Sequence, residues 1–240
     1  MKYQKAFMGP FLTKPFFNDK EMEQMCSDAL KNAGLLPKEP SSIRIDRFIE
    51  KHFDLTEEYQ PLEENILGYA KFDIKGLRKI VIAQSLGDDT SEVAQCRTRS
   101  TLAHEAGHGL CHTHLWIEKI MAERHQPSLW KDESQNGSIV RDGFMCRDSM
   151  ITPSQAAAKS QWWEMQANLA MSCLLLPMKL LSQAAEPLIE DIRRSKGEER
   201  NVLIHDAERK LAKIFKVNPI MVQYRLQKWW EENALQGVLL

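Results

Sequence analysis

The stretch Thr-Leu-Ala-His-Glu-Ala-Gly-His-Gly-Leu-Cys-His-Thr-His, residues 101–114, decides the fold because it sets His104, Glu105 and His108 at the spacing His-Glu-x-x-His. On an α-helix, residues four positions apart lie on one face, so the two imidazoles can meet a single ion. Glu105 lies beside them and can take a proton from an activated water and return it to a leaving amine. Zinc suits this arrangement, because two histidines and one further protein ligand leave a fourth tetrahedral position for water.

The same spacing can also arise by chance on a helix that binds nothing, in roughly one such chain in a hundred. The neighbours Leu102, Ala106 and Leu110 argue against chance, because they place the motif on an apolar helix. A buried cluster of histidine and glutamate is costly without a partner. We therefore predict a bound divalent metal, with zinc as the cofactor.

Two histidines that follow the motif are candidates for a third ligand. His114 occupies the last position of a longer pattern, His-Glu-x-x-His-x-x-Gly-x-x-His, but Cys111 stands where that pattern has glycine. Without the glycine the helix continues and turns His114 away from the ion. His112 lies on the correct face but about 12 Å along the axis from His104, too far to share one ion with it. We expect both to be ordinary histidines at the end of the helix.

Glu164 is the third candidate, in the segment Trp-Trp-Glu-Met-Gln-Ala-Asn at residues 162–168. The two tryptophans and the apolar run 167–176 favour a buried helix, and a buried carboxylate needs a partner. Asn168 lies one turn later, where its amide oxygen can accept a hydrogen bond from a ligand histidine and fix its orientation. The alternative is a surface glutamate on an amphipathic helix.

Several motifs together resemble the ImmA/IrrE family of zinc metallopeptidases, over roughly residues 40–228. The motifs are Leu-Ala-His-Glu-Ala-Gly-His at 102–108, Glu-x-x-Ala-Asn at 164–168, Leu-Leu-Leu-Pro at 174–177, Leu-Ala-x-x-Phe-x-Val at 211–217 and Arg-Leu at 225–226.

The resemblance implies a role for each residue of the predicted site. His104, His108 and Glu164 would be the metal ligands, Glu105 the catalytic carboxylate, and Asn168 the residue behind the ligands, as in gluzincins. It also implies that the substrate is a protein, with helix-turn-helix repressors as the substrate class.

The chain departs from the commoner family pattern in the long segment between His108 and Glu164, which contains Trp130, Cys146 and Arg147. Cys146 offers two readings. Its thiol could reach the metal and block it, which would make activity dependent on redox state. The plainer reading, which we favour, is a buried cysteine in a strand.

Composition excludes several classes of protein. The chain has 240 residues, 43% of them hydrophobic, enough for one sizeable core, and its formal net charge of −1 argues against nucleic acid or an anionic membrane as an obligatory partner. Residues 1–22 lack the continuous apolar stretch of a secretory signal, and no stretch has the length needed to cross a bilayer. The five scattered cysteines indicate reduced thiols. We expect a cytoplasmic protein.

Periodicity and capping residues predict mainly helices. Two strands joined at Gly76 are expected between residues 66 and 84, and the metal-binding helix from Val93 to about Cys111. Residues 127–152 are irregular apart from a strand at 144–146, and we expect a loop or hairpin near the cleft. Further helices are expected at 18–34, 40–53, 152–176, 177–194, 201–215 and 218–232.

The fold class that follows is α+β, a predominantly helical, zincin-like metallopeptidase domain with a small antiparallel sheet before the metal-binding helix. Within one compact domain, residues 1–54 are expected to pack on the core as a helical segment. Residues 55–196 are expected to form the metal-binding core, and residues 197–240 a helical cap.

The function predicted from the motif is hydrolysis of peptide bonds by a zinc-activated water, with Glu105 as general base and acid. His205, Tyr224 and Arg147 are chemically able to stabilise an oxyanion, and none is assigned. The substrate backbone is expected to pair with the sheet edge near residues 66–84. A metal-binding regulatory protein without hydrolytic activity is the alternative that keeps the metal.

A second alternative is a DNA-binding regulator built on residues 201–236. Arg209, Lys213 and Lys216 form a basic stripe, and a second helix begins at Asn218 after a short turn, as in a helix-turn-helix. Against this reading, the two helices carry more apolar surface than exposed helices can leave unburied. The apolar residues are Ile214, Phe215, Ile220, Val222, Leu226, Trp229 and Trp230. We therefore expect a helical cap.

Overall fold

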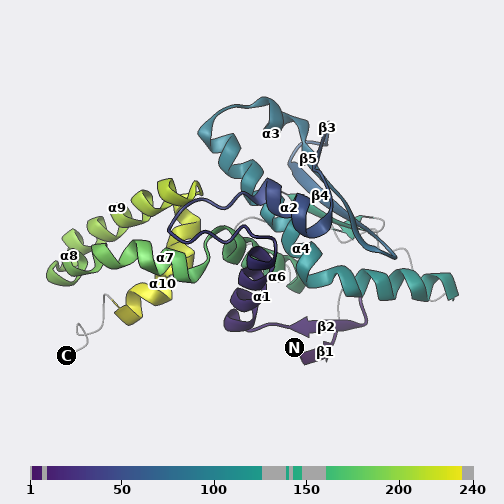
Figure 1. The fold of residues 1–240 in the computed structure, drawn as a ribbon, viewed down its shortest axis with the longest axis horizontal. Coiled ribbons are helices and arrows are strands. Elements are labelled where there is room, and N and C mark those ends of the chain that lie inside the picture. Colours follow the sequence, from purple (N-terminus) through teal and green to yellow (C-terminus); the bar gives the residue numbers. More distant parts are fainter. Residues whose placement is uncertain (1, 7–9, 126–138, 141–142, 148–160, 234–240) are drawn as a thin grey trace.

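Helix α4 (Glu92–His125) organises the computed structural model, which describes residues 2–6, 10–125, 139–140, 143–147 and 161–233. The 34-residue helix contains the His-Glu-x-x-His segment and runs through the middle of the molecule before extending to one side (Figure 1). The Ser91 hydroxyl caps its start by accepting a hydrogen bond from the Ala94 amide at 3.2 Å. The predicted end near Cys111 is wrong. The helix continues because no proline occurs before Pro127.

A mixed sheet packs against α4. Its strand order among the described residues is β3 (Glu58–Gln60), β5 (Gly76–Ala83), β4 (Ile66–Asp73), β7 (Gly143–Arg147) and β6 (Ile139–Val140). The predicted β4–β5 hairpin and the strand at 144–146 are confirmed. The sheet differs from the expected one in two respects: β3 runs parallel to β5, and β6 and β7 follow α4 in the chain.

The sheet edge that was expected to hold substrate near residues 66–84 is largely covered. β4 pairs with β5 on one side and with β7 on the other, and the end of β5 pairs with β3. The outermost described strands are therefore β3 and β6. The short helix α3 (Gln84–Asp88) connects β5 to the segment that precedes α4.

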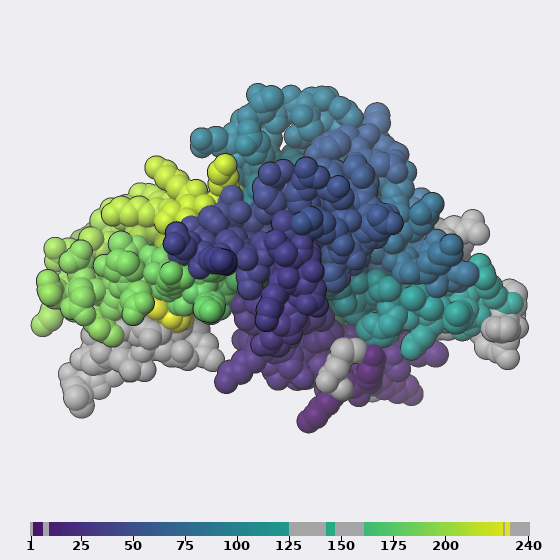
Figure 2. Space-filling model, in the orientation of Figure 1, coloured from purple at the N-terminus to yellow at the C-terminus, as the bar shows by residue number. Residues whose placement is uncertain are grey.

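The N-terminal part contributes a hairpin and two helices. Strands β1 (Lys2–Lys5) and β2 (Thr13–Phe16), which the sequence did not predict, pair antiparallel and lie beside α4, on the outer surface of the molecule (Figure 2). Helix α1 (Asp19–Asn32) begins with a capping box, in which Asn18 and Glu21 exchange two hydrogen bonds of 2.9 and 3.0 Å. Helix α2 (Ile45–Phe53) follows.

The C-terminal part is helical: α6 (Trp162–Leu175), α7 (Met178–Ala185), the 3₁₀ turn η3 (Glu186–Leu188), α8 (Ile189–Arg194), α9 (Gly197–Phe215) and α10 (Pro219–Asn233). The expected single helix from 177 to 194 is wrong, because Pro187 lacks an N–H and breaks it into α7, η3 and α8. The predicted start of α6 at Thr152 lies outside the described residues. None of the described helices has the length and apolar character needed to cross a membrane.

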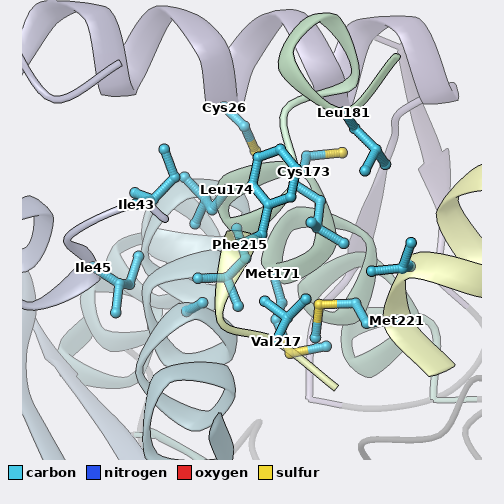
Figure 3. Packing of buried hydrophobic residues seen from close by; sticks show 14 of the residues in the cluster. Cys26, Ile43, Ile45, Met171, Cys173, Leu174, Leu181, Phe215, Val217 and Met221 are labelled. Carbon is cyan, nitrogen blue, oxygen red and sulfur yellow. The ribbon is translucent and has the colours of Figure 1, made fainter. Parts of the chain in front are cut away.

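A continuous apolar core joins these helices. Side chains of α1 (Cys26), α6 (Cys173 and Leu174) and α9 (Phe215) meet there, together with Met221 of α10 (Figure 3). A second, smaller cluster is aromatic and lies between α4, the sheet and α6. It comprises Phe11, Ala70, Phe72, Leu115, Trp116, Phe144, Trp162 and Trp163. Helices α4 and α6 therefore contribute to both clusters, and the metal motif lies on these two helices.

Gly107 sets the separation of α4 and α6. A Cβ at this position would lie 2.9 Å from the Ala167 carbonyl oxygen and 3.1 Å from the Ala170 Cβ. Gly107→Val is therefore expected to force the helices apart and lower the free energy of unfolding by about 1–3 kcal/mol. Urea denaturation measures this change. Met121→Val, at an exposed site on the same helix, serves as the control and should change it by less than about 1 kcal/mol. Equal losses in both variants would show that the close approach is unimportant.

Candidate metal centre

Three predicted ligands meet between α4 and α6. The His104 Nε2 lies 3.0 Å from the Glu164 Oε2 and 3.1 Å from the His108 Nε2, and the His108 Nε2 lies 3.6 Å from the same carboxylate oxygen. All three residues are completely buried. The surface position that was the alternative for Glu164 is therefore excluded.

The triangle of donor atoms has the size that a small tetrahedral cation requires. Ligand atoms bound at about 2.0–2.1 Å to tetrahedral zinc are separated by about 3.3–3.4 Å. The three observed edges of 3.0, 3.1 and 3.6 Å bracket that value. The other carboxylate oxygen of Glu164, Oε1, is buried and has no hydrogen-bond partner among the described residues. The buried group could hold a metal ion.

Asn168 fixes the protonation of one ligand. The amide oxygen of Asn168 lies 2.9 Å from the His104 Nδ1, so this nitrogen donates the hydrogen bond. A neutral His104 then has a lone pair on Nε2, directed at His108 and Glu164. Three acceptors that converge in a buried site repel one another unless a cation lies between them. A single proton can bridge one edge of the triangle but not all three.

The pKa values of the three candidate ligands are shifted because these groups are buried next to one another. Burial opposes ionisation of Glu164, but the contacts with His108 and His104 outweigh it and hold the carboxyl pKa well below its usual range. Burial also lowers the pKa of His104, yet Glu164 reverses this effect and raises it overall. Burial lowers the pKa of His108 to about 4, with Glu164 acting in the opposite sense. The site thus favours a carboxylate and a neutral His108, the forms that bind metal.

Glu105 lies at the same centre, where the Ala70 backbone acts weakly to favour its carboxylate form. It is completely buried, and both oxygens lack a hydrogen-bond partner among the described residues. Burial raises its pKa to about 8, with His104 lowering it and Glu164 adding to the rise. A carboxyl group whose pKa lies near neutrality is suited to taking up and returning a proton.

Strand β7 closes one side of the cluster. The Phe144 ring stacks on His108 with centroids 4.0 Å apart and an interplanar angle of 14°. Cys146 is buried on the same strand, as predicted, and its Sγ and single donor atoms of His104 and Glu105 all lie within 4.8 Å of one another. The thiol is therefore both a buried strand cysteine and a close neighbour of the candidate ligand His104.

His112 and His114 are not helix-end residues, because α4 continues to His125. Neither belongs to the metal-ligand groups among the described residues.

His114 is half-buried and meets the Tyr3 ring edge-on at 5.8 Å. His112 is completely buried and lies 3.0 Å from the His108 Nδ1 and 3.0 Å from the Gln166 Oε1. The contact of His112 with a metal ligand is the feature that sequence reasoning missed.

Two of the three candidate oxyanion donors are exposed side chains of the C-terminal helices. His205 is exposed on α9, where it contacts Glu208 at 3.1 Å, and Tyr224 is exposed on α10. The side chain of Arg147 lies outside the described residues. No described residue is therefore assigned to oxyanion stabilisation.

Helices α9 and α10 pack their apolar side chains against the main core. Phe215, Val222, Leu226 and Trp230 are buried in the main core, whereas Ile214 and Ile220 are exposed. The Arg225 guanidinium contacts the Glu23 carboxylate and the Leu176 carbonyl, which fastens α10 to α1 and α6.

Neither the models of known protein families nor the curated proteins give a match to this chain.

Proposed function

We propose that the protein is a zinc-dependent peptidase, with His104, His108 and Glu164 as ligands and Glu105 as the proton carrier. The observation that carries the proposal is the buried triangle of donor atoms beside a carboxylate whose two oxygens have no described hydrogen-bond partner. Two imidazoles and one carboxylate form the ligand set of catalytic zinc sites that keep one position open. The resemblance to ImmA/IrrE metallopeptidases supports the same assignment.

Zinc bound to these ligands would supply a polarised water and a Lewis acid for the scissile carbonyl. The protein residues provide the rest. Asn168 orients His104 through its Nδ1, 2.9 Å from the amide oxygen. Glu105 takes the proton from the attacking water and delivers it to the amine of the departing peptide. No covalent bond between enzyme and substrate is required.

The substrate class is part of the proposal. The resemblance points to a helix-turn-helix repressor, and the chain offers no evidence for a membrane partner. Among the described strands, β6 forms the edge of the sheet beyond β7, and this edge is the one closest in strand order to the candidate site. An extended peptide that pairs there would lie beside the metal centre.

Hydrolysis in oxygen-18 water tests the proposed reaction. The zinc-loaded protein is incubated with purified helix-turn-helix repressors, and the products are analysed by mass spectrometry. The expected result is a discrete cut with one heavy oxygen in the new carboxyl terminus and a free amine on the other fragment. Intact repressors after incubation with protein that contains one zinc per chain would favour a metal-binding regulatory protein without hydrolytic activity.

A further inference from the structure

A chain of four hydrogen-bonding groups extends from the metal ligand His108 to the N-terminal hairpin. The His108 Nδ1 lies 3.0 Å from the His112 Nδ1, and the His112 Nε2 lies 3.0 Å from the Gln166 Oε1. The Gln166 amide nitrogen in turn lies 2.6 Å from the Pro15 carbonyl oxygen. Three elements that are distant in the sequence, α4, α6 and β2, thereby join behind one ligand.

The last group of the chain determines the position of every hydrogen. The Pro15 carbonyl can only accept, so the Gln166 side chain presents its N–H₂ to Pro15 and its oxygen to His112. His112 must then carry its hydrogen on Nε2. In a neutral imidazole this leaves Nδ1 as an acceptor, which receives the hydrogen of the His108 Nδ1. The Nε2 of His108 is left with a lone pair that faces the metal position.

The surroundings of His112 keep it neutral. It is completely buried, and its other ring neighbours are the apolar faces of Phe144 and Trp162, with centroids 5.3 and 5.6 Å away. Among the described residues, its hydrogen-bonding contacts are with the neutral groups of His108 and Gln166. An unpaired imidazolium in such a position would be costly.

We infer that His112 is a positioning residue of the metal centre, which fixes the tautomer and ring orientation of His108 and is itself fixed by Gln166 and the N-terminal hairpin. This inference rests on the proposed zinc site. Ligand histidines usually donate their second N–H to a carboxylate, a carbonyl or water. Here an imidazole takes that place, because the helical repeat that joins His104 to His108 continues to His112 on the same face.

The N-terminal hairpin, which provides the last group of this hydrogen-bonded chain, is itself held in place by aromatic contacts. Phe11, which precedes β2, is buried against Trp116, Phe144 and Trp162, with ring centroids 5.2, 6.0 and 6.1 Å away. The Lys14 ammonium lies over the Trp162 ring at 5.9 Å. The N-terminal residues therefore act as structural support for the candidate ligands, although they lie about ninety positions before His104 and His108 in the chain.

Three full-length variants test the inference through zinc affinity and histidine tautomers. His112→Phe keeps a ring but removes the acceptor, and zinc affinity is expected to fall about 10–100-fold. His112→Asn retains an acceptor near the position of Nδ1 and should bind zinc more tightly than His112→Phe. Gln166→Met removes the anchor of His112 at a half-buried site and should lower affinity in the same direction. Met165→Ala, an exposed neighbour on α6, serves as the control and should bind as wild type does.

Imidazole nitrogen-15 shifts of the metal-free protein supply a readout that a merely structural role would not move. The expected pattern is Nδ1–H on His108 and Nε2–H on His112, with the His112 preference lost in Gln166→Met. Should His112→Phe misfold, Gln166→Met and the tautomer measurement still decide the question. Wild-type zinc affinity in His112→Phe, or an Nδ1–H on His112, would overturn the inference. A wild-type protein that binds no zinc would instead remove the proposed function.

Discussion

Glu105→Gln is expected to lower the rate of peptide-bond cleavage by about 10²–10⁴-fold while zinc remains bound. Glutamine has nearly the shape of glutamate but cannot take a proton from water. None of the three donor atoms of the triangle belongs to Glu105, so zinc affinity should change little. Single-turnover cleavage of a repressor and competition with a zinc indicator measure the two quantities.

Glu118→Gln is the matched control for this variant, because Glu118 lies exposed on the same helix. Its cleavage rate should equal that of wild type. The metal-free Glu105→Gln protein should unfold no more easily than wild type, since the carboxylate it replaces has no described hydrogen-bond partner. Equal cleavage by wild type and Glu105→Gln would remove Glu105 from the mechanism, whereas loss of zinc would make it a ligand.

Glu164→Gln is expected to weaken zinc binding by more than about 100-fold, because changes outside the ligand set alone cost about 10–100-fold. This corresponds to about 3 kcal/mol or more of binding free energy. The variant loses the negative charge that lies 3.0 Å and 3.6 Å from the two ligand histidines. Cleavage should fall with zinc occupancy and recover in part when zinc is added in excess.

Glu118→Gln again provides the control, with affinity unchanged. Glu164→Asp distinguishes the effect of the negative charge from the effect of side-chain length, since it keeps the carboxylate but shortens the side chain by one methylene. It should bind zinc more tightly than Glu164→Gln and less tightly than wild type. If Glu164→Gln bound zinc as tightly as wild type does, the Glu164 carboxylate would not be a ligand, and the proposed ligand set would be wrong.

The candidate ligand set could be predicted from sequence because each of its members leaves a local signal. His104 and His108 are recognised by their spacing on one helix face. Glu164 is recognised because it follows two tryptophans and precedes an apolar run. The structure brings these three residues together in the buried cluster that could hold a metal. Capping at Asn18 and Ser91, and the hairpin at Gly76, were predictable for the same reason, since their residues are adjacent in the chain.

Some of the features that the sequence did not predict depend on contacts between distant segments. His112 lies in register with the metal motif, but its role depends on Gln166 and Pro15, which no local pattern connects to it. Strand β1 is exposed throughout and β2 is mostly half-buried, and neither short strand has a strong alternating pattern. The break of the expected helix 177–194 did have a local signal in Pro187, and so did the length of α4, in which no proline follows the motif before Pro127.

The most direct test of the central claim is X-ray absorption at the zinc edge of the purified, zinc-loaded protein. The expected first shell contains two imidazole nitrogens and carboxylate oxygen at about 2.0–2.2 Å, with no sulfur. Scattering from the outer ring atoms should require two histidines, and one histidine contribution should vanish in His108→Ala. A sulfur neighbour at about 2.3 Å would instead identify Cys146 as a ligand, and a shell of oxygens alone would contradict the site formed by His104, His108 and Glu164.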